Sequence, residues 1–264
     1  MKGLYLYGVC PFGKTKELPR IEGIDVQGEV FFVPYQDIKA IVSEVSLKEF
    51  GADEIQKRAT EDLEWIKDKA LMHEKVLEKV MKICSDSVIP MKFGMIFKTK
   101  KGVSDSLKEN YSKFKNLFEK LRGKEEWSIK IYLKFQLLEN EIKNTSPIIQ
   151  GKMKEINSLP AGKVYFLEEE INEAVKVESR NSIDNYISLF LERIGQLVEK
   201  VQENKILGKE LTQKNDPMVF NGAFLVKKEK VDRFQEEIQE LQAEYQKIGF
   251  TFEISGPWPP YNFV

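Results

Sequence analysis

The chain has 264 residues, of which 42% are hydrophobic and 31% are charged, and its formal net charge is −1. This composition is typical of a helix-rich globular protein that is long enough for two modest domains. The balance of 41 basic and 42 acidic residues excludes an overall field that would recruit nucleic acid or an anionic membrane. No run of about 18 apolar residues predicts a membrane span, so we expect a cytoplasmic protein.

Residues 1–123 predict an α+β domain with a small sheet. Alternating or clustered aliphatic and aromatic residues indicate strands at 4–9, 29–33, 38–45 and, as a single strand covered on both faces, Val88–Phe97. In the last of these, Pro90 and Gly94 indicate a bulge or a sheet edge.

Two helices complete this predicted domain. The first is expected to start at Asp53 as its N-cap and to continue to Cys84, because small or apolar residues recur every three or four positions from Ala59 onward. The second is expected to be capped by Ser104 and to end at Gly123.

Residues 124–264 predict a second α+β domain. Strands are expected at 126–135, 205–211 (a weak one), 219–226 and 250–254, and helices at 138–204 and 230–248. The order β-α-β-β-α-β is that of a ferredoxin-like domain with a helical insertion, about 138–204, in its first crossover. Breaks in the insertion are expected at Ser146-Pro147, at 159–162 and at Glu178–Asn181.

The sequence predicts no catalytic, cofactor-binding or metal-binding residue. His73 is the one histidine, and its place on the apolar helical stripe favours a buried residue with one hydrogen bond. Cys10 and Cys84 match no metal spacing; Cys84 is interpreted as a small buried hydrophobe, too far along the helix from His73 to form a catalytic pair. The acidic runs Glu168–Glu170 and Glu236-Glu237 are interpreted as solvated helix faces.

Two other functions are compatible with a ferredoxin-like order of elements. A ferredoxin-like order also occurs in RNA-recognition modules, but Ile131–Phe135 lacks their glycine-bearing aromatic motif. A small-molecule enzyme of unknown substrate remains the alternative function, because element order alone does not exclude it.

The stretch 256–263 is unusual because it combines three prolines with three large aromatic residues. One hypothesis is that this tail packs its rings into a seam between the two domains. The other is that some rings stay exposed as a docking patch for another protein.

Several stretches resemble the gas vesicle accessory proteins of the GvpF/GvpL family. The resemblance is carried by Leu71–Leu77, by Val88–Phe97 (VIPMKFGMIF), by Ser255–Phe263 (SGPWPPYNF) and by the opening Leu4–Gly8. It spans nearly the whole chain, and Glu125–Tyr132 is closer to the L branch than to the F branch.

This resemblance implies a non-enzymatic, chaperone-like assembly factor without a cofactor, associated with the gas vesicle during assembly. The expected partners are the small hydrophobic major shell protein and other accessory proteins. We predict strand addition at the Pro90-bearing edge or at the 205–211 edge. The candidate partner-binding residues are Phe93, Phe97, Trp258, Tyr261 and Phe263.

Overall fold

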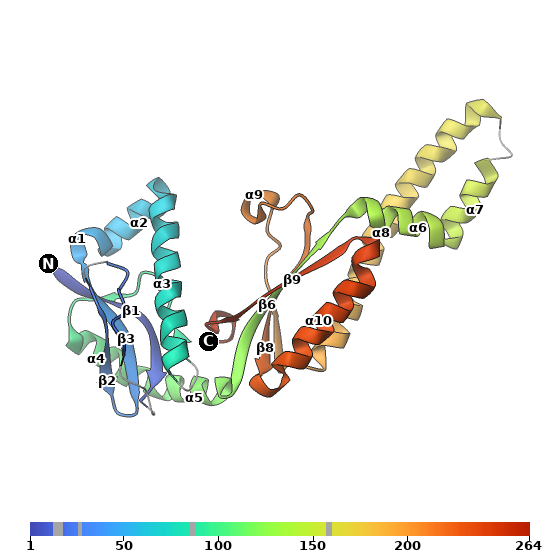
Figure 1. Cartoon of the computed structure of the whole chain (residues 1–264). Coiled ribbons are helices and arrows are strands. Elements are labelled where there is room, and N and C mark those ends of the chain that lie inside the picture. The colour runs from blue at the N-terminus through green and yellow to red at the C-terminus, as the bar shows by residue number, and fades with distance from the viewer. Residues whose placement is uncertain (13–17, 26–27, 85–87, 157–159) are drawn as a thin grey trace. The chain divides into compact units, whose positions relative to one another are not determined.

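The computed structural model describes residues 1–12, 18–25, 28–84, 88–156 and 160–264. The chain forms two compact units (Figure 1): unit 1 is Met1–Glu126 with Pro257–Val264, and unit 2 is Trp127–Gly256. Each contains one sheet packed by helices, so the predicted α+β class is confirmed. The predicted boundary followed residue 123 and placed the tail with the second domain, whereas residues 257–264 here belong to unit 1.

Unit 1 is built on one antiparallel sheet. Its elements, in chain order, are β1 Lys2–Pro11, β2 Val30–Tyr35, β3 Ile38–Ser46, α1 Leu47–Phe50, α2 Ala52–Glu61, α3 Leu63–Ile83, β4 Ile89–Pro90, β5 Ile96–Phe97, α4 Lys100–Glu109, α5 Tyr111–Leu121 and the short terminal turn η3 Tyr261–Phe263. The strand order is β2-β3-β1-β4, and β5 also pairs with β1.

The central strand β1 is covered on both faces. Tyr5 and Tyr7 are fully buried in a core cluster that includes residues of α3. Leu4 and Leu6 are also buried and, because side chains alternate along a strand, they face the opposite side of the sheet. A bulge between Leu6 and Gly8 interrupts the register with β3. This continuous burial explains why the β1 sequence is almost entirely apolar or aromatic.

The long helix predicted from Asp53 is in fact two helices. Asp62 leaves helical geometry between α2 and α3, and its carboxylate accepts the backbone N–H of Trp65 at 3.1 Å. It therefore caps α3, whereas α2 begins after Gly51, so the prediction of Asp53 as the N-cap was wrong. The break also exposes Leu63, which the stripe pattern had placed inside.

The single strand predicted at Val88–Phe97 is also divided. The two-residue strands β4 and β5 both pair with β1, at Gly8–Val9 and at Leu4–Tyr5 respectively. Between them Gly94 has φ +84°, a left-handed conformation that glycine adopts without strain. The helix predicted after this strand also differs from the structure. Its cap is Thr99, not Ser104, because the Thr99 side chain accepts the Gly102 N–H at 3.1 Å. The predicted single helix is also two helices, α4 and α5, and α5 begins after Asn110.

Unit 2 follows the predicted β-α-β-β-α-β order. Its elements are β6 Lys124–Leu133 (which starts in unit 1), α6 Phe135–Thr145, α7 Pro147–Ile156, α8 Ala161–Gly195, β7 Lys200–Glu203, α9 Lys209–Thr212, β8 Met218–Lys227, η1 Lys228–Lys230, α10 Val231–Tyr245, η2 Gln246–Ile248 and β9 Phe250–Trp258. The strand order is β7-β8-β6-β9, so β6 and β8 are central and the helices α6 to α8 form the insertion.

Two predicted features of unit 2 were wrong. The weak strand expected at 205–211 lies earlier, as β7, because Val201 packs against the core of the unit while residues 209–212 are helical. The weak point expected at Glu178–Asn181 lies inside the continuous helix α8. There the Ser146 hydroxyl donates to Glu178 at 2.9 Å, which ties α8 to the start of α7. The predicted break at Ser146-Pro147 is present, whereas the one at 159–162 lies partly outside the described residues.

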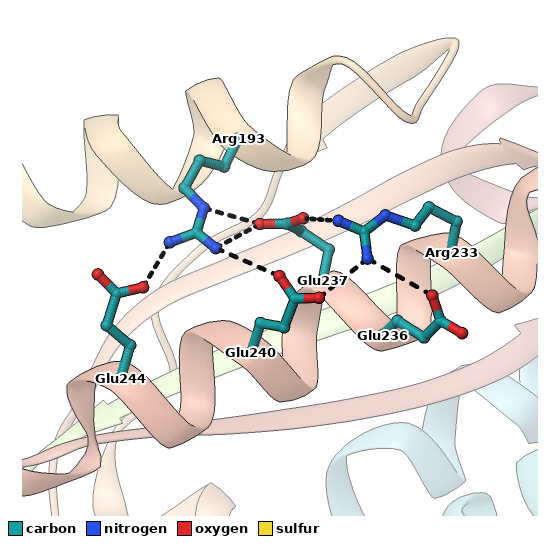
Figure 2. A network of polar contacts seen from close by, with 6 residues as sticks. All are labelled: Arg193, Arg233, Glu236, Glu237, Glu240 and Glu244. Carbon is teal, nitrogen blue, oxygen red and sulfur yellow. Dashed lines mark hydrogen bonds and ion pairs between the residues drawn. The ribbon is translucent and has the colours of Figure 1, made fainter.

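A network of charged residues joins α8 to α10 (Figure 2). Glu237, only 7% exposed, accepts from Arg193 at 2.7 Å and from Arg233 at 3.0 Å. Arg193 also binds Glu244 at 2.7 Å. The prediction that Glu236 and Glu237 both lie on a solvated face is therefore wrong for Glu237, which is buried and bound by two guanidinium groups.

Candidate functional site

The most structured group of polar side chains in unit 1 lies where α3 meets β1. The Tyr5 hydroxyl accepts the Gly94 N–H at 3.0 Å, so its own proton is available to His73 Nδ1 at 2.8 Å. Tyr7 lies two residues further along β1. Its hydroxyl accepts the Ile24 N–H at 2.6 Å and pairs with Ser43 Oγ at 2.8 Å. The two tyrosines therefore connect the sheet to α3, to the turn before β5 and to the 18–25 segment.

His73 is enclosed by aromatic rings. It is 2% exposed, and the ring centroids of Tyr5, Tyr7 and Phe93 lie 5.5 to 6.3 Å from its own. Burial lowers the pKa of His73 to about 4, so the ring is neutral at physiological pH. In the described part of the chain its Nε2 has no hydrogen-bond partner. This geometry agrees with the predicted buried histidine with one hydrogen bond.

The C-terminal tail completes this cluster. The Tyr261 ring lies 6.5 Å from the His73 ring, and the Tyr261 hydroxyl donates to the carboxylate of Glu74, the next residue on α3. Burial raises the pKa of the Glu74 carboxyl. Burial and the bond to Glu74 together raise the pKa of Tyr261 well above that of an ordinary tyrosine.

A second carboxylate binds the next residue of the tail. Glu126, 4% exposed, accepts the Asn262 backbone N–H at 3.1 Å and its side-chain amide at 2.7 Å. Burial raises the pKa of Glu126, while the two bonds from Asn262 oppose that rise. We call Tyr5, His73, Glu74, Glu126, Tyr261 and Asn262 the tail-docking cluster, and all six belong to unit 1.

The structure places the five predicted partner-binding residues differently. Phe93 and Tyr261 pack against His73 in the core of unit 1. Phe97 lies in β5, half-buried, beside Gly102 of α4. Trp258 and Phe263 are half-buried. The structure therefore brings two of the five together, and their binding role stays a prediction.

Sequence reasoning missed the roles of Glu74, Glu126 and Asn262. Glu126 directly precedes the buried Trp127 within a strand. A charged residue at such a position was one available signal of a buried, bonded carboxylate. Asn262 gave no such signal, because its partner lies 136 positions earlier in the chain.

Among the residues that the structure describes, no three His, Cys, Asp or Glu side chains gather closely enough to hold a metal ion. Within the same ranges, no helix is both long and apolar enough to cross a bilayer. Cys10 and Cys84, remote in sequence, lie together in the core of unit 1.

Comparison with known proteins decides the family. The model of the family described as "Gas vesicle synthesis protein GvpL/GvpF" matches residues 3–264. The chain belongs to the GvpL/GvpF family. This confirms the resemblance drawn from the sequence, and because one family model covers both branches, assignment to the L branch stays a prediction.

Relatives and solved structures agree with this membership. Gas vesicle protein F1 of Halobacterium salinarum is 26% identical over 264 residues, covering 100% of this chain and 93% of the relative. The crystal structure of GvpF from Anabaena sp. PCC7120 matches with a TM-score of 0.71 at 20% identity, covering 100% of this chain and 96% of that one. GvpF from Microcystis aeruginosa matches with a TM-score of 0.65 at 22% identity, covering 99% and 98%. The fold is therefore shared with GvpF.

Proposed function

We propose that this protein is a non-enzymatic accessory factor that binds the hydrophobic gas vesicle shell protein, together with other accessory proteins, during vesicle formation. Membership of the GvpL/GvpF family across residues 3–264 is the observation that carries the proposal. We further propose that it acts in the cytoplasm and associates with the gas vesicle during assembly.

We place shell-protein binding at the edge formed by β4 and β5. β4 is the last strand of the sheet order, and β5 extends the same side of β1. Met95, Ile96 and Phe97 are half-buried at this edge. An apolar strand from a client can pair with such an edge through main-chain hydrogen bonds while neighbouring side chains cover its apolar face. Phe97 is the flanking aromatic residue in this proposal.

The hydrogen-bond pattern identifies the backbone groups that a client strand would meet. The Leu6 N–H donates to the Met95 carbonyl at 2.8 Å, so residue 95 bonds toward β1. Because bonding direction alternates along an antiparallel pair, the N–H and C=O of Ile96, opposite Tyr5, point away from β1. Ile96 therefore offers one donor and one acceptor to an added strand.

The second edge is less suited to this role. β7 ends the unit 2 sheet, but it has four residues, of which Val201 packs against the core and the other three are exposed polar or charged residues. Exposed charge on an edge strand opposes pairing with an apolar client. We therefore propose the β4–β5 edge as the primary site and β7 as the alternative.

The absence of catalysis is part of the proposal. His73 Nδ1 is bound by the Tyr5 hydroxyl, and the enclosing rings keep the imidazole neutral and away from solvent. A general base needs access to the proton that it removes. The environment of His73 favours a structural role over a catalytic one.

A substitution at Ile96 tests the binding site. Ile96→Pro removes the outward N–H but leaves the Met95 carbonyl free to accept from Leu6, and proline is tolerated on an edge strand whose N–H faces outward. Ile96→Val is the matched control, because it keeps the N–H. We expect Ile96→Pro to weaken binding to purified shell protein by about tenfold, the effect of losing one hydrogen bond and stranding its acceptor. Ile96→Val should bind like the parent protein.

Equal binding by the two variants would rule out strand addition at this edge. Hydrogen exchange on the complex would then locate the true site: new protection at residues 200–203 would favour β7, and protection confined to helices would favour a helical groove. Thermal-shift screening with nucleotides and metals tests the enzyme alternative, which stabilisation by a small ligand without shell-protein binding would favour.

A further inference from the structure

The chain's two cysteines, separated by most of unit 1 in sequence, are neighbours in its core. Cys10 lies near the end of β1 and is fully buried, and Cys84 directly follows α3 and is 8% exposed. Both belong to the core cluster that includes residues of β1 and α3. The Cys10 thiol makes a side-chain hydrogen bond with the sulfur of Cys84, and the two are not joined by a disulfide.

Two thiols in hydrogen-bond contact need little movement to form a disulfide, because the bond requires neighbouring Cβ atoms. Backbone hydrogen bonds position both residues. β1 pairs with β3 through Cys10 opposite Lys39, and the Cys84 N–H donates to the Val80 carbonyl at 2.8 Å. The two sulfurs therefore meet where β1 lies beside the C-terminal end of α3.

The two thiols differ in their access to an oxidant. Cys10 is fully enclosed, and the bond to Cys84 together with burial raises the pKa of its thiol. Cys84 keeps a small exposed fraction. Attack on a soluble oxidant therefore begins at Cys84, and Cys10 is the thiol that resolves the product.

We propose that Cys10 and Cys84 are a redox pair that a hydroperoxide converts into an intramolecular disulfide. The Cys84 thiolate attacks the terminal peroxide oxygen, the O–O bond breaks, and the departing alkoxide takes up the thiol proton to give an alcohol and Cys84 sulfenic acid. Cys10 then attacks the Cys84 sulfur and the S–O bond breaks; the departing hydroxide takes the Cys10 proton and leaves as water. The two sulfurs lose two electrons, and the peroxide gains them.

The disulfide would fasten the end of α3 to β1 close to the β4–β5 edge. β4 pairs with Gly8 and Val9, which directly precede Cys10. Closing a loop from residue 10 to residue 84 restricts the unfolded chain strongly, so oxidation stabilises unit 1 against unfolding. This inference does not depend on the proposed function.

Peptide mapping of the full-length protein tests the pair. The reduced protein is treated with hydrogen peroxide, its remaining thiols are alkylated under denaturing conditions, and it is digested without reductant. We expect a peptide joining Cys10 to Cys84, formed in the monomer at a rate independent of protein concentration and removed by dithiothreitol. The urea midpoint of unfolding should rise on oxidation and return on reduction.

Two single variants serve as controls. Cys10→Ser should accumulate sulfenic acid at Cys84, trapped by dimedone, and Cys84→Ser should react far more slowly at Cys10. The proposal is overturned if the oxidised wild-type protein carries sulfinic acid at Cys84 while Cys10 is still alkylated, or if the only disulfide formed joins two chains. Both of these outcomes are read on the wild-type protein, so they hold even if a variant fails to fold.

Discussion

At the level of single residues, His73 is a neutral imidazole that folding keeps from protonating. Its folded pKa of about 4 lies below the ordinary value of 6.5, so the unfolded chain binds more protons between these pH values. Stability from this group is therefore fully present above about pH 6.5 and is lost as the pH falls toward 4. The full shift corresponds to about 3 kcal/mol.

His73→Gln should remove this dependence. The variant keeps a polar group for Tyr5, and the difference in free energy of unfolding between parent and variant should change by about 3 kcal/mol from pH 7 to pH 4. Urea titrations at both pH values measure it. Burial raises the pKa of Glu74 and Glu126, and those groups change stability with pH in the opposite direction. Because both proteins contain them, the parent–variant difference isolates the contribution of His73. A parent–variant difference that is independent of pH would contradict a buried neutral histidine.

Glu126 is a buried carboxylate that depends on Asn262 for two hydrogen bonds. Asn262→Ala removes the 2.7 Å bond to its buried carboxylate but keeps the backbone bond. We expect the free energy of unfolding to fall by about 1–3 kcal/mol, the cost of leaving a buried polar group short of a partner. Asn185→Ala, at an exposed position of α8, is the matched control and should cost nothing. Similar urea midpoints for the two variants would mean that the Glu126–Asn262 contact is energetically neutral.

At the level of elements, the turn between β4 and β5 depends on the backbone of Gly94. A Cβ at this position would have ordinary contacts, the nearest being Ile55 at 3.6 Å, so only the left-handed φ opposes a side chain. Gly94→Ala should therefore cost about 1 kcal/mol of stability. Gly151→Ala, in α7 with open space around it, should instead stabilise by about 0.5–1 kcal/mol. Thermal unfolding of the two variants should shift in opposite directions.

The same elements show how much of the fold was predictable from sequence. Apolar periodicity placed most helices and the long strands, because burial repeats with the period of the element. It did not detect the break at Asp62, since a local side-chain cap interrupts a helix without interrupting the apolar pattern. It also merged β4 with β5, because both are apolar, and neither the turn at Gly94 nor their separate pairing with β1 changes the apolar pattern.

The candidate site was less predictable for a related reason. The sequence indicated His73 as buried and the tail as unusual, because each is visible locally. The Glu74–Tyr261 and Glu126–Asn262 bonds join positions far apart in the chain. No local pattern specifies such a pair, so these contacts needed the three-dimensional structure.

At the level of the whole molecule, the tail should stabilise unit 1 selectively. Deleting residues 257–264 removes Tyr261 and Asn262 from that unit. Trp65, packed 5.4 Å from Phe50, reports on unit 1, and the buried Trp127 reports on unit 2. With Trp127→Phe or Trp65→Phe in the truncated chain, each unit is followed separately by fluorescence. We expect the Trp65 transition to move to lower urea by more than the Trp127 transition.

The control for this prediction is the same pair of substitutions in full-length chains that also carry Trp258→Phe, so that each chain keeps a single tryptophan. These chains correct for any effect of the tryptophan changes themselves. Equal shifts of both transitions would show that the tail does not act on unit 1 alone. A shift of the Trp127 transition only would contradict the assignment of the tail to unit 1.

Because unit 1 is assembled from two separated segments, its completion has an order in time. A ribosome translates residues 1–126 first, then the whole of 127–256, and only afterwards the residues that bond to Glu74 and Glu126. A nascent chain that stalls within unit 2 therefore carries an unfinished first unit, with two buried-site carboxylates lacking these partners. Unit 1 therefore reaches its final stability only after the sequence of unit 2 has been made.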